Sequence, residues 1–418
     1  MKTAILWVIK MVNHKKKISI INITCLVIAF IQSVIVARLL GTSIYGEVVV
    51  ASSLIIFIQN VVGLRTGELI LRYYKKNSNE KYNVLSKIIL IDIKMSIVLS
   101  FICLTFYFSF LDSFDVNKNY YLFFLLIIPS MICSLVFESL LICENKIYQF
   151  TKVKLFHHLI GVFLCVALIY NFHVYGYIAS LVISNFLKLI VLIFITYKDF
   201  LSKGVFAGND IRLDGFKKFT LNSYLSSSFK SGVSNLDVII LSGIVSSDKV
   251  AIYKVAKNLS AIPGGFMGSV WNAAHSKILE FSENRQYKEL NKLTNSYTKL
   301  FFYMSLVFIP SAYFISEFMI KLIYGESYRD AYIPFMILMG GNFFAYAMAP
   351  FNKIFYIAHD KMEKMMFLNA FNFFFILILG YFGCENATSM AIIVSSALSL
   401  VSLYSKIEVL NKERYYLG

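Results

Sequence analysis

Long apolar runs separated by short polar segments occupy most of the chain. Twelve of these runs are long enough to cross the hydrocarbon core of a bilayer, which is roughly 30 Å thick. A backbone exposed to lipid must satisfy its own hydrogen bonds, so each run is expected to be helical. The pattern predicts an all-α integral membrane protein with about twelve transmembrane helices, at 18–40, 44–64, 87–110, 120–143, 153–171, 175–197, 219–245, 250–272, 299–320, 331–352, 364–382 and 387–407.

The composition agrees with this prediction, and the distribution of charge orients the chain. Hydrophobic residues make up 58% of the sequence and charged residues only 15%, which is typical of a polytopic membrane protein. With the N-terminus inside, 30 of the 40 Lys and Arg residues fall on the cytoplasmic side and 5 on the opposite side. Cytoplasmic loops carry this excess, so both termini are expected in the cytoplasm. The basic net charge is thereby explained without a nucleic-acid partner.

An internal repeat predicts two lobes. The turn GTSIYG at 41–46 lies about 205 residues before the turn SDKVA at 247–251, close to half of the 418 residues. Duplicated helical bundles of this kind occur in secondary transporters. We therefore predict a six-helix N-terminal lobe (1–197), a cytoplasmic linker (198–218) and a pseudo-symmetric six-helix C-terminal lobe (219–418).

The apolar hairpin at 235–280 contains charges at depths where lipid is expected. Its first helix has Asp237 on one face with Lys230, and its second helix has Lys254 and Lys257 on one face. A charge at the middle of a bilayer helix costs about 3 kcal/mol on insertion scales, so these groups need a paired or wet environment. Asp237 and Lys257 fall at similar depth, so two interpretations stay open: the two side chains pair with each other, or the lysines face an anionic substrate while Asp237 tunes them or takes a coupling ion.

Other charges in or near the runs extend the set of candidates. Lys188 lies too far from the inner end of its run for its ammonium group to reach the headgroups easily, so it is expected to face a cavity or to pair with a carboxylate such as Asp92. Only Asp92 and Asp237 are counted as deep acids. The predicted substrate-binding cations are Lys188, Lys230, Lys254, Lys257, Arg38 and Arg65.

Pro263, Gly264 and Gly265 form a candidate hinge. Proline removes a backbone hydrogen bond and bends a helix, and the two glycines follow it directly. Membrane helices also tolerate proline without any such role.

The chain has no motif for catalysis or nucleotide binding. It contains no GxSxG, no GxxxxGK[ST] and no HExxH. Its six cysteines form no CxxC and no Cys/His ligand pattern. We expect neither an enzyme, a metal site nor a cofactor, and H⁺ and Na⁺ both stay open as coupling ions.

The hairpin also resembles a known family. Asp237, an apolar run, a short polar turn and IYKVA at 252–256 are similar to the segment that opens the second half of bacterial polysaccharide flippases, the Wzx-type branch of the multidrug/oligosaccharidyl-lipid/polysaccharide (MOP) exporter superfamily. ARLLGTSIYGEVVV at 37–50 resembles the first hairpin of that family, and LIYGESYRDAYIPF at 322–335 its turn into the tenth helix. Members commonly have an Arg after the Asp, a Gly before the Ile-Tyr pair and a Pro closing the second helix; here Val238, Ala251 and Ala274-His275 stand there.

The resemblance implies a MATE/MOP-like fold in a bacterial cytoplasmic (inner) membrane. It implies a flippase that moves a polyprenyl-pyrophosphate-linked oligosaccharide, an O-antigen, capsule or exopolysaccharide repeat unit, to the outer face by alternating access. The partners would be a lipid of the undecaprenyl-pyrophosphate type, membrane lipid, and polysaccharide polymerase and assembly proteins. The diphosphate would meet the lysines of a central cavity.

Two alternatives remain. A MATE-like drug/ion antiporter that exports cationic drugs is expected to place net acid in its cavity, whereas this chain places more lysines than acids inside its runs. A membrane enzyme of polysaccharide assembly, such as a polymerase or glycosyltransferase, usually carries a large outward loop, and the predicted outward loops here are short.

Overall fold

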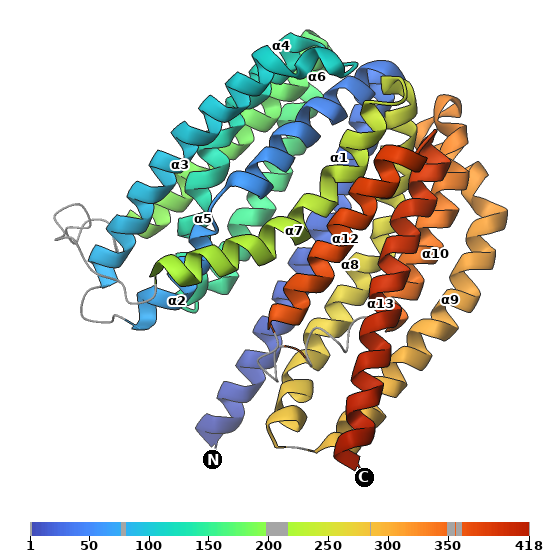
Figure 1. Ribbon diagram of the computed structural model, residues 1–418. Coiled ribbons are helices and arrows are strands. Elements are labelled where there is room, and N and C mark those ends of the chain that lie inside the picture. Colours follow the sequence, from blue (N-terminus) through green and yellow to red (C-terminus); the bar gives the residue numbers. More distant parts are fainter. Residues whose placement is uncertain are drawn as a thin grey trace. The chain divides into compact units, whose positions relative to one another are not determined.

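The computed structural model describes the backbone of residues 2–76, 81–197, 216–284, 286–348, 356 and 362–417. Every regular element within these residues is a helix. Contacts divide the chain into two compact units, one of residues 1–40 and 58–227 and one of residues 41–57 and 228–418 (Figure 1). Most of the predicted linker 198–218 lies outside the described residues, so the lobe boundary at this place stays a prediction.

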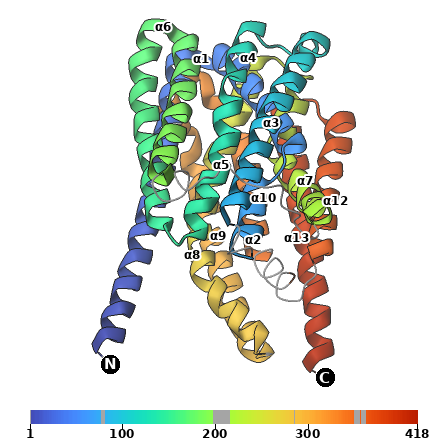
Figure 2. The same cartoon turned by 90° about the vertical axis from the view of Figure 1, so that its left-hand side faces the viewer.

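The first unit is a bundle of apolar helices. Figures 1 and 2 show α3, α5 and α6 side by side, with α2 packed against α3 and α5. Helix α6 contains a break at His173 (φ 48°, ψ −124°) and is therefore two helices joined there. The elements of the first unit are the two ends of α1 (Lys2–Val62), then α2 (Thr66–Lys76), α3 (Lys81–Ser109), η2 (Leu111–Ser113), α4 (Lys118–Leu125), α5 (Ile127–Cys143), α6 (Ile147–Tyr197) and the start of α7 (Phe216–Ser242).

The second unit is built around α10 (Tyr332–Met348), which contacts α8 (Ser247–Glu283), α9 (Tyr287–Tyr324) and α13 (Ala387–Leu417). It also contains most of α7, the short helix η5 (Glu326–Ala331) and α12 (Met362–Gly383). The middle part of α1 belongs here as well, because α1 leaves helical geometry at Gly41 (φ 74°, ψ 174°) and continues as a second helix.

The predicted membrane helices are present. Within the described residues, eight helical stretches are long and apolar enough to cross a membrane. Two of these stretches contain the breaks at Gly41 and His173, so each of the two holds two of the predicted runs. The two remaining runs fall on α7 and α8, the charged hairpin. The prediction of an all-α integral membrane protein is confirmed.

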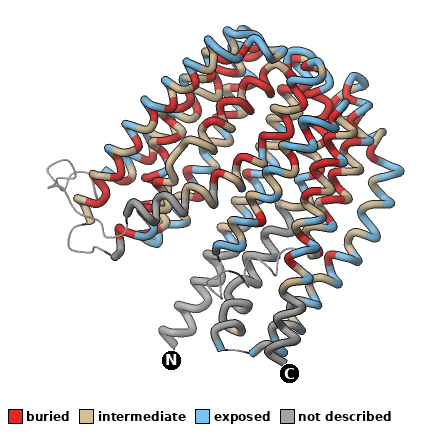
Figure 3. The backbone as a smooth tube through the Cα atoms, in the orientation of Figure 1, coloured by how far each residue is buried: buried red, intermediate tan, exposed pale blue. Residues whose placement is uncertain are grey.

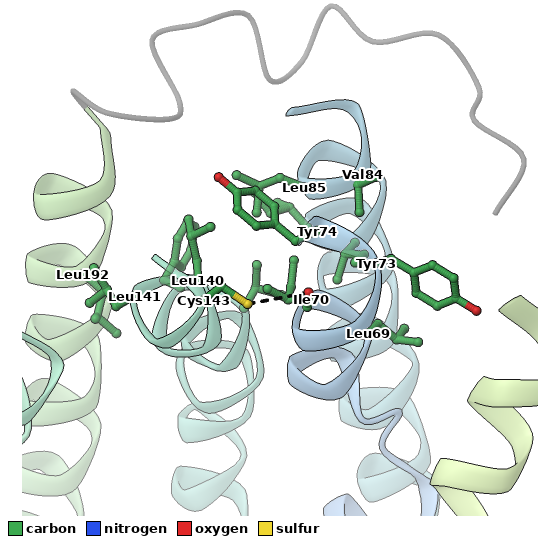
Figure 4. Packing of buried hydrophobic residues seen from close by; sticks show 14 of the residues in the cluster. Leu69, Ile70, Tyr73, Tyr74, Val84, Leu85, Leu140, Leu141, Cys143 and Leu192 are labelled. Atoms are coloured by element: carbon green, nitrogen blue, oxygen red, sulfur yellow. Dashed lines mark hydrogen bonds between the residues drawn. The ribbon is translucent and has the colours of Figure 1, made fainter. Parts of the chain in front are cut away.

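Burial follows helix packing within each unit. Buried residues lie on the helix sides that face a neighbour, and the outer sides expose large apolar residues such as Phe194 and Phe314 (Figure 3). One core cluster joins α2, α3, α5 and α6, where Tyr73 and Tyr74 of α2 are almost fully buried (Figure 4). Apolar outer faces suit lipid, because exposed aromatic residues at this density would be unfavourable in water.

The two repeated turns meet in the second unit. Gly46, in the GTSIYG turn, packs so tightly on the backbone carbonyl of Ser247, the first residue of α8, that a Cβ on Gly46 would overlap it. Glycine is required here by this close approach of two backbones. Superposition of 18–197 on 219–407 as pseudo-equivalent halves stays a prediction.

Candidate functional site

An ion pair at the centre of the charged hairpin joins α7 to α8. The Asp237 side chain is 1% exposed, and Lys257 Nζ donates to both of its carboxylate oxygens at 2.7 Å. The Tyr253 hydroxyl donates to Asp237 Oδ2 at 2.6 Å, and the Val238 backbone N–H donates to Oδ1 at 2.9 Å. Four hydrogen bonds from three donor groups satisfy this carboxylate in the way that a buried charge requires.

The helical spacing explains why these groups meet. Tyr253 and Lys257 are four residues apart and therefore share a face of α8, which they turn toward α7. Lys257 also donates to the Ser234 carbonyl at 2.7 Å, so it contacts α7 at two points one turn apart. The expectation that Asp237 and Lys257 pair with each other agrees with this geometry.

Lys254 lies one turn before Lys257, and its surroundings differ from those of Lys257. It is half-buried, and within the described part of the chain its ammonium group has no ion pair and no hydrogen bond. Lys257 and Asp237 both lie within electrostatic range of it. Since Lys257 and Tyr253 already occupy the Asp237 carboxylate, that acid has little capacity left for Lys254. Around Asp237, the described part of the hairpin therefore has one neutralised pair, Asp237 and Lys257, with Lys254 as a cation beside it.

In the first unit, the partner of Lys188 differs from the one expected. Its Nζ lies 3.0 Å from Glu138 Oε1, and the two side chains are 16% and 22% exposed. The suggested pairing of Lys188 with Asp92 is thus wrong, because α5, which carries Glu138, packs directly on α6. The count of two deep acids is also corrected, since Glu138 lies inside α5. His157 lies close by and its Nδ1 is 3.1 Å from the Ser184 carbonyl oxygen.

The remaining predicted residues occupy separate places. Lys230 and Arg38 are exposed, Arg65 is half-buried just before α2, and Asp92 is buried on α3. Their roles in substrate binding stay predictions.

The hinge candidate lies where α8 packs on α10. A Cβ on Gly264 would overlap the Tyr346 hydroxyl, and Asn342, one turn earlier on α10, donates to the Ser260 carbonyl at 3.1 Å. Pro263 stands between these two contacts, inside α8. The surroundings of Gly265 lie outside the described residues. Hinge motion stays a prediction.

Two participants were missed at the sequence level, and each left a signal. Glu138 is an acid inside the apolar run 120–143, and the rule applied to Asp92 would have selected it. Tyr253 stands four residues before Lys257, so a shared face could have been inferred. In the described residues, no group of three or more His, Cys, Asp or Glu side chains is placed to hold a metal ion, and the six cysteines are free.

Apolar helices with lipid-type outer faces and ion pairs between neighbouring membrane helices define a polytopic membrane protein. The sequence profile of the polysaccharide biosynthesis protein family matches residues 15–275, more than half of the chain, and the protein belongs to that family.

Solved structures with a similar fold cover nearly the whole chain. A multidrug resistance MATE family transporter of the MOP superfamily in its inward-facing conformation is similar with a TM-score of 0.71 at 12% identity, over 96% of this chain and 94% of the other. A MOP superfamily transporter from Pyrococcus furiosus, described as having a binding pocket of reverse polarity that suggests a different function, is similar with a TM-score of 0.59 at 13% identity, over 97% and 96%. No curated protein sequence matches.

Proposed function

We propose that the protein is a flippase that moves a polyprenyl-pyrophosphate-linked oligosaccharide from the cytoplasmic to the outer face of the cytoplasmic membrane by alternating access. Membership of the polysaccharide biosynthesis family supports the substrate class. The observation that carries the proposal is Lys254, a half-buried ammonium group that has no partner among the described residues and lies beside a saturated ion pair.

The energetic argument is one of compensation. An unpaired ammonium group in a membrane helix costs about 3 kcal/mol on insertion scales, and it is retained when water, a carboxylate or an anionic ligand offsets that cost. Asp237 is occupied by Lys257, so an anion from outside the protein is the matching occupant. A diphosphate offers several charged oxygens, and charge-assisted hydrogen bonds to them are among the strongest available. Lys254 would bind the pyrophosphate, and Asp237 would hold Lys257 and the hairpin in place.

The proposal treats the protein as a transporter without an enzymatic reaction, working with polysaccharide polymerase and assembly proteins. A MATE-like drug/ion antiporter is the second candidate, and one observation favours it: Glu138 adds an acid to the interior of the first unit. That acid is paired with Lys188, however, so it adds no net negative charge for a cationic drug.

Gene deletion combined with mass spectrometry of lipid-linked intermediates tests the proposal. A flippase predicts that a complete repeat unit accumulates on its polyprenyl pyrophosphate carrier at the cytoplasmic face. Accumulation of incomplete repeat units would indicate a glycosyltransferase instead. Unchanged intermediates together with increased drug sensitivity would favour the antiporter.

The orientation is part of the proposal, with both termini in the cytoplasm. Single cysteines placed at Ser113 and Ser246 should react with a membrane-impermeant maleimide added outside whole cells, because both residues are exposed and lie in predicted outward turns. Cysteines at Gly208 and Glu283 should react only after the membrane is opened. Labelling of Gly208→Cys from outside would show that the orientation is the reverse of the one proposed.

A further inference from the structure

Asp92 on α3 is a buried acid whose carboxylate is unsatisfied. The residue is 1% exposed, and within the described part of the chain neither carboxylate oxygen has a hydrogen bond or an ion pair. This contrasts with Asp237, which accepts four hydrogen bonds from three donor groups. A buried acid that is left unsatisfied calls for a physical explanation.

Few groups act on the Asp92 carboxylate. The Thr66 hydroxyl from α2 lies beside it, and the Cys133 thiol from α5 is within electrostatic range. Thr66 is fully buried, and its oxygen is also without a hydrogen bond. Among the charged residues with described side chains on the helices packed on this region, none forms an ion pair with Asp92; they are Lys81, Lys87 and Lys94 on α3, Glu68 and Arg72 on α2, Glu138 on α5 and Lys118 on α4.

These surroundings favour the neutral acid. An ionised carboxylate in a dry site without donors is strongly unfavourable, and such groups bind a proton instead. A protonated Asp92 also gains an O–H that can donate to Thr66, which would satisfy both residues. A hard metal cation requires a shell of several oxygen ligands, and among the described residues no group of three or more His, Cys, Asp or Glu side chains is placed to hold one.

Thr66, the residue that lies beside Asp92, is the first residue of α2. Residues 63–65 between α1 and α2 are not helical, so α2 is joined to α1 by a short non-helical connection. Gly67, the next residue of α2, packs on the Ser139 side chain of α5. A small movement of α2 about this connection would separate Thr66 from Asp92 and admit water, and hydration stabilises the ionised form.

We infer that Asp92 is a proton-binding site covered by α2, neutral when Thr66 lies against it and able to release its proton to water when α2 moves away. The proton site stands on the geometry of the first unit. Its use as the coupling step of export rests on the proposed function.

Infrared spectroscopy of the full-length protein in lipid tests the site without any substrate. Wild type at neutral pH should show the carbonyl stretch of a protonated carboxylic acid, and Asp92→Asn should lose that band. Thr66→Val, which keeps the shape of the side chain but removes the hydrogen-bond partner, should shift the band to higher frequency. Asp237→Asn is the matched control and should leave it unchanged, because Asp237 is ion-paired.

Two results would overturn the proton site: the absence of a band that depends on Asp92, or its loss when choline in the buffer is replaced by sodium, which would indicate a cation site. The coupling role is tested separately, by lipid-linked intermediates in a deletion strain that expresses Asp92→Asn. Accumulation as in the deletion supports coupling. Normal export contradicts it and leaves the flippase proposal unaffected.

Discussion

Lys257 Nζ lies 2.7 Å from both carboxylate oxygens of Asp237 and so joins α7 to α8 inside the apolar part of the second unit. The pair distinguishes residues with a structural role in the hairpin from the lysine with a proposed role in substrate binding, which the sequence alone does not do. Asp237 and Lys257 neutralise each other and join the two helices of the hairpin, whereas Lys254, one turn away, is the cation to which the proposed function assigns the substrate.

The first prediction concerns this pair. Asp237→Ala should lower stability by about 3–5 kcal/mol, because it leaves Lys257 half-buried without its carboxylate. The double variant Asp237→Ala/Lys257→Ala should be more stable than Asp237→Ala, since no charge then remains unpaired. Thermal unfolding of the purified protein measures both. Lys118→Ala removes an exposed ion pair with Asp112 and is the control without a measurable change.

Lys254 should be needed for export and not for folding. Lys254→Ala should weaken substrate binding roughly 10–100-fold, the equivalent of about 1.5–3 kcal/mol for a hydrogen bond to a charged group. Lys254→Arg should keep part of the export because it keeps the charge. Lys249→Ala, at an exposed lysine early in α8, is the matched control. Full export by Lys254→Ala at normal protein level would exclude this side chain from the substrate site.

Glu138 and Lys188 should behave as a structural pair. Glu138→Gln removes the carboxylate that compensates Lys188, so unfolding should become easier by about 1–3 kcal/mol, less than for the more buried Asp237. The exchange Glu138→Lys/Lys188→Glu restores opposite charges and should recover part of the loss. If the exchanged protein is no more stable than Glu138→Gln, the contact between the two side chains is not what stabilises the unit.

Gly46 should be intolerant of even one methyl group. Gly46→Ala places a Cβ against the Ser247 carbonyl, and overpacking of this kind typically costs about 1–3 kcal/mol. Gly340 on α10 is the control, because a Cβ there meets no atom within 4 Å. Equal melting temperatures of the two alanine variants would contradict the close packing of the two turns.

Most of the fold could be predicted because a membrane helix is specified locally. A run of about 20 apolar residues is sufficient to identify one, and all twelve predicted runs fall on helices. The Asp237–Lys257 pair was also within reach, because both residues belong to one hairpin and its short turn fixes their relative depth.

The features that could not be predicted depend on packing between distant segments. Lys188 could have met either of two acids, and the choice of Glu138 over Asp92 follows from the contact of α5 with α6. The meeting of Gly46 with Ser247 needs two backbones 201 residues apart to approach each other. Likewise, no local pattern indicates that Thr66 covers Asp92.

The most direct test of the account is lipid translocation by the purified protein. Vesicles that contain a polyprenyl-pyrophosphate-linked oligosaccharide are treated with a membrane-impermeant reagent that modifies its sugars. Protein-free vesicles should expose only the pool in the outer leaflet. Vesicles with wild-type protein should expose the whole pool, and vesicles with Lys254→Ala should do so much more slowly. An accessible pool that is the same with wild-type protein as without protein would contradict the flippase assignment.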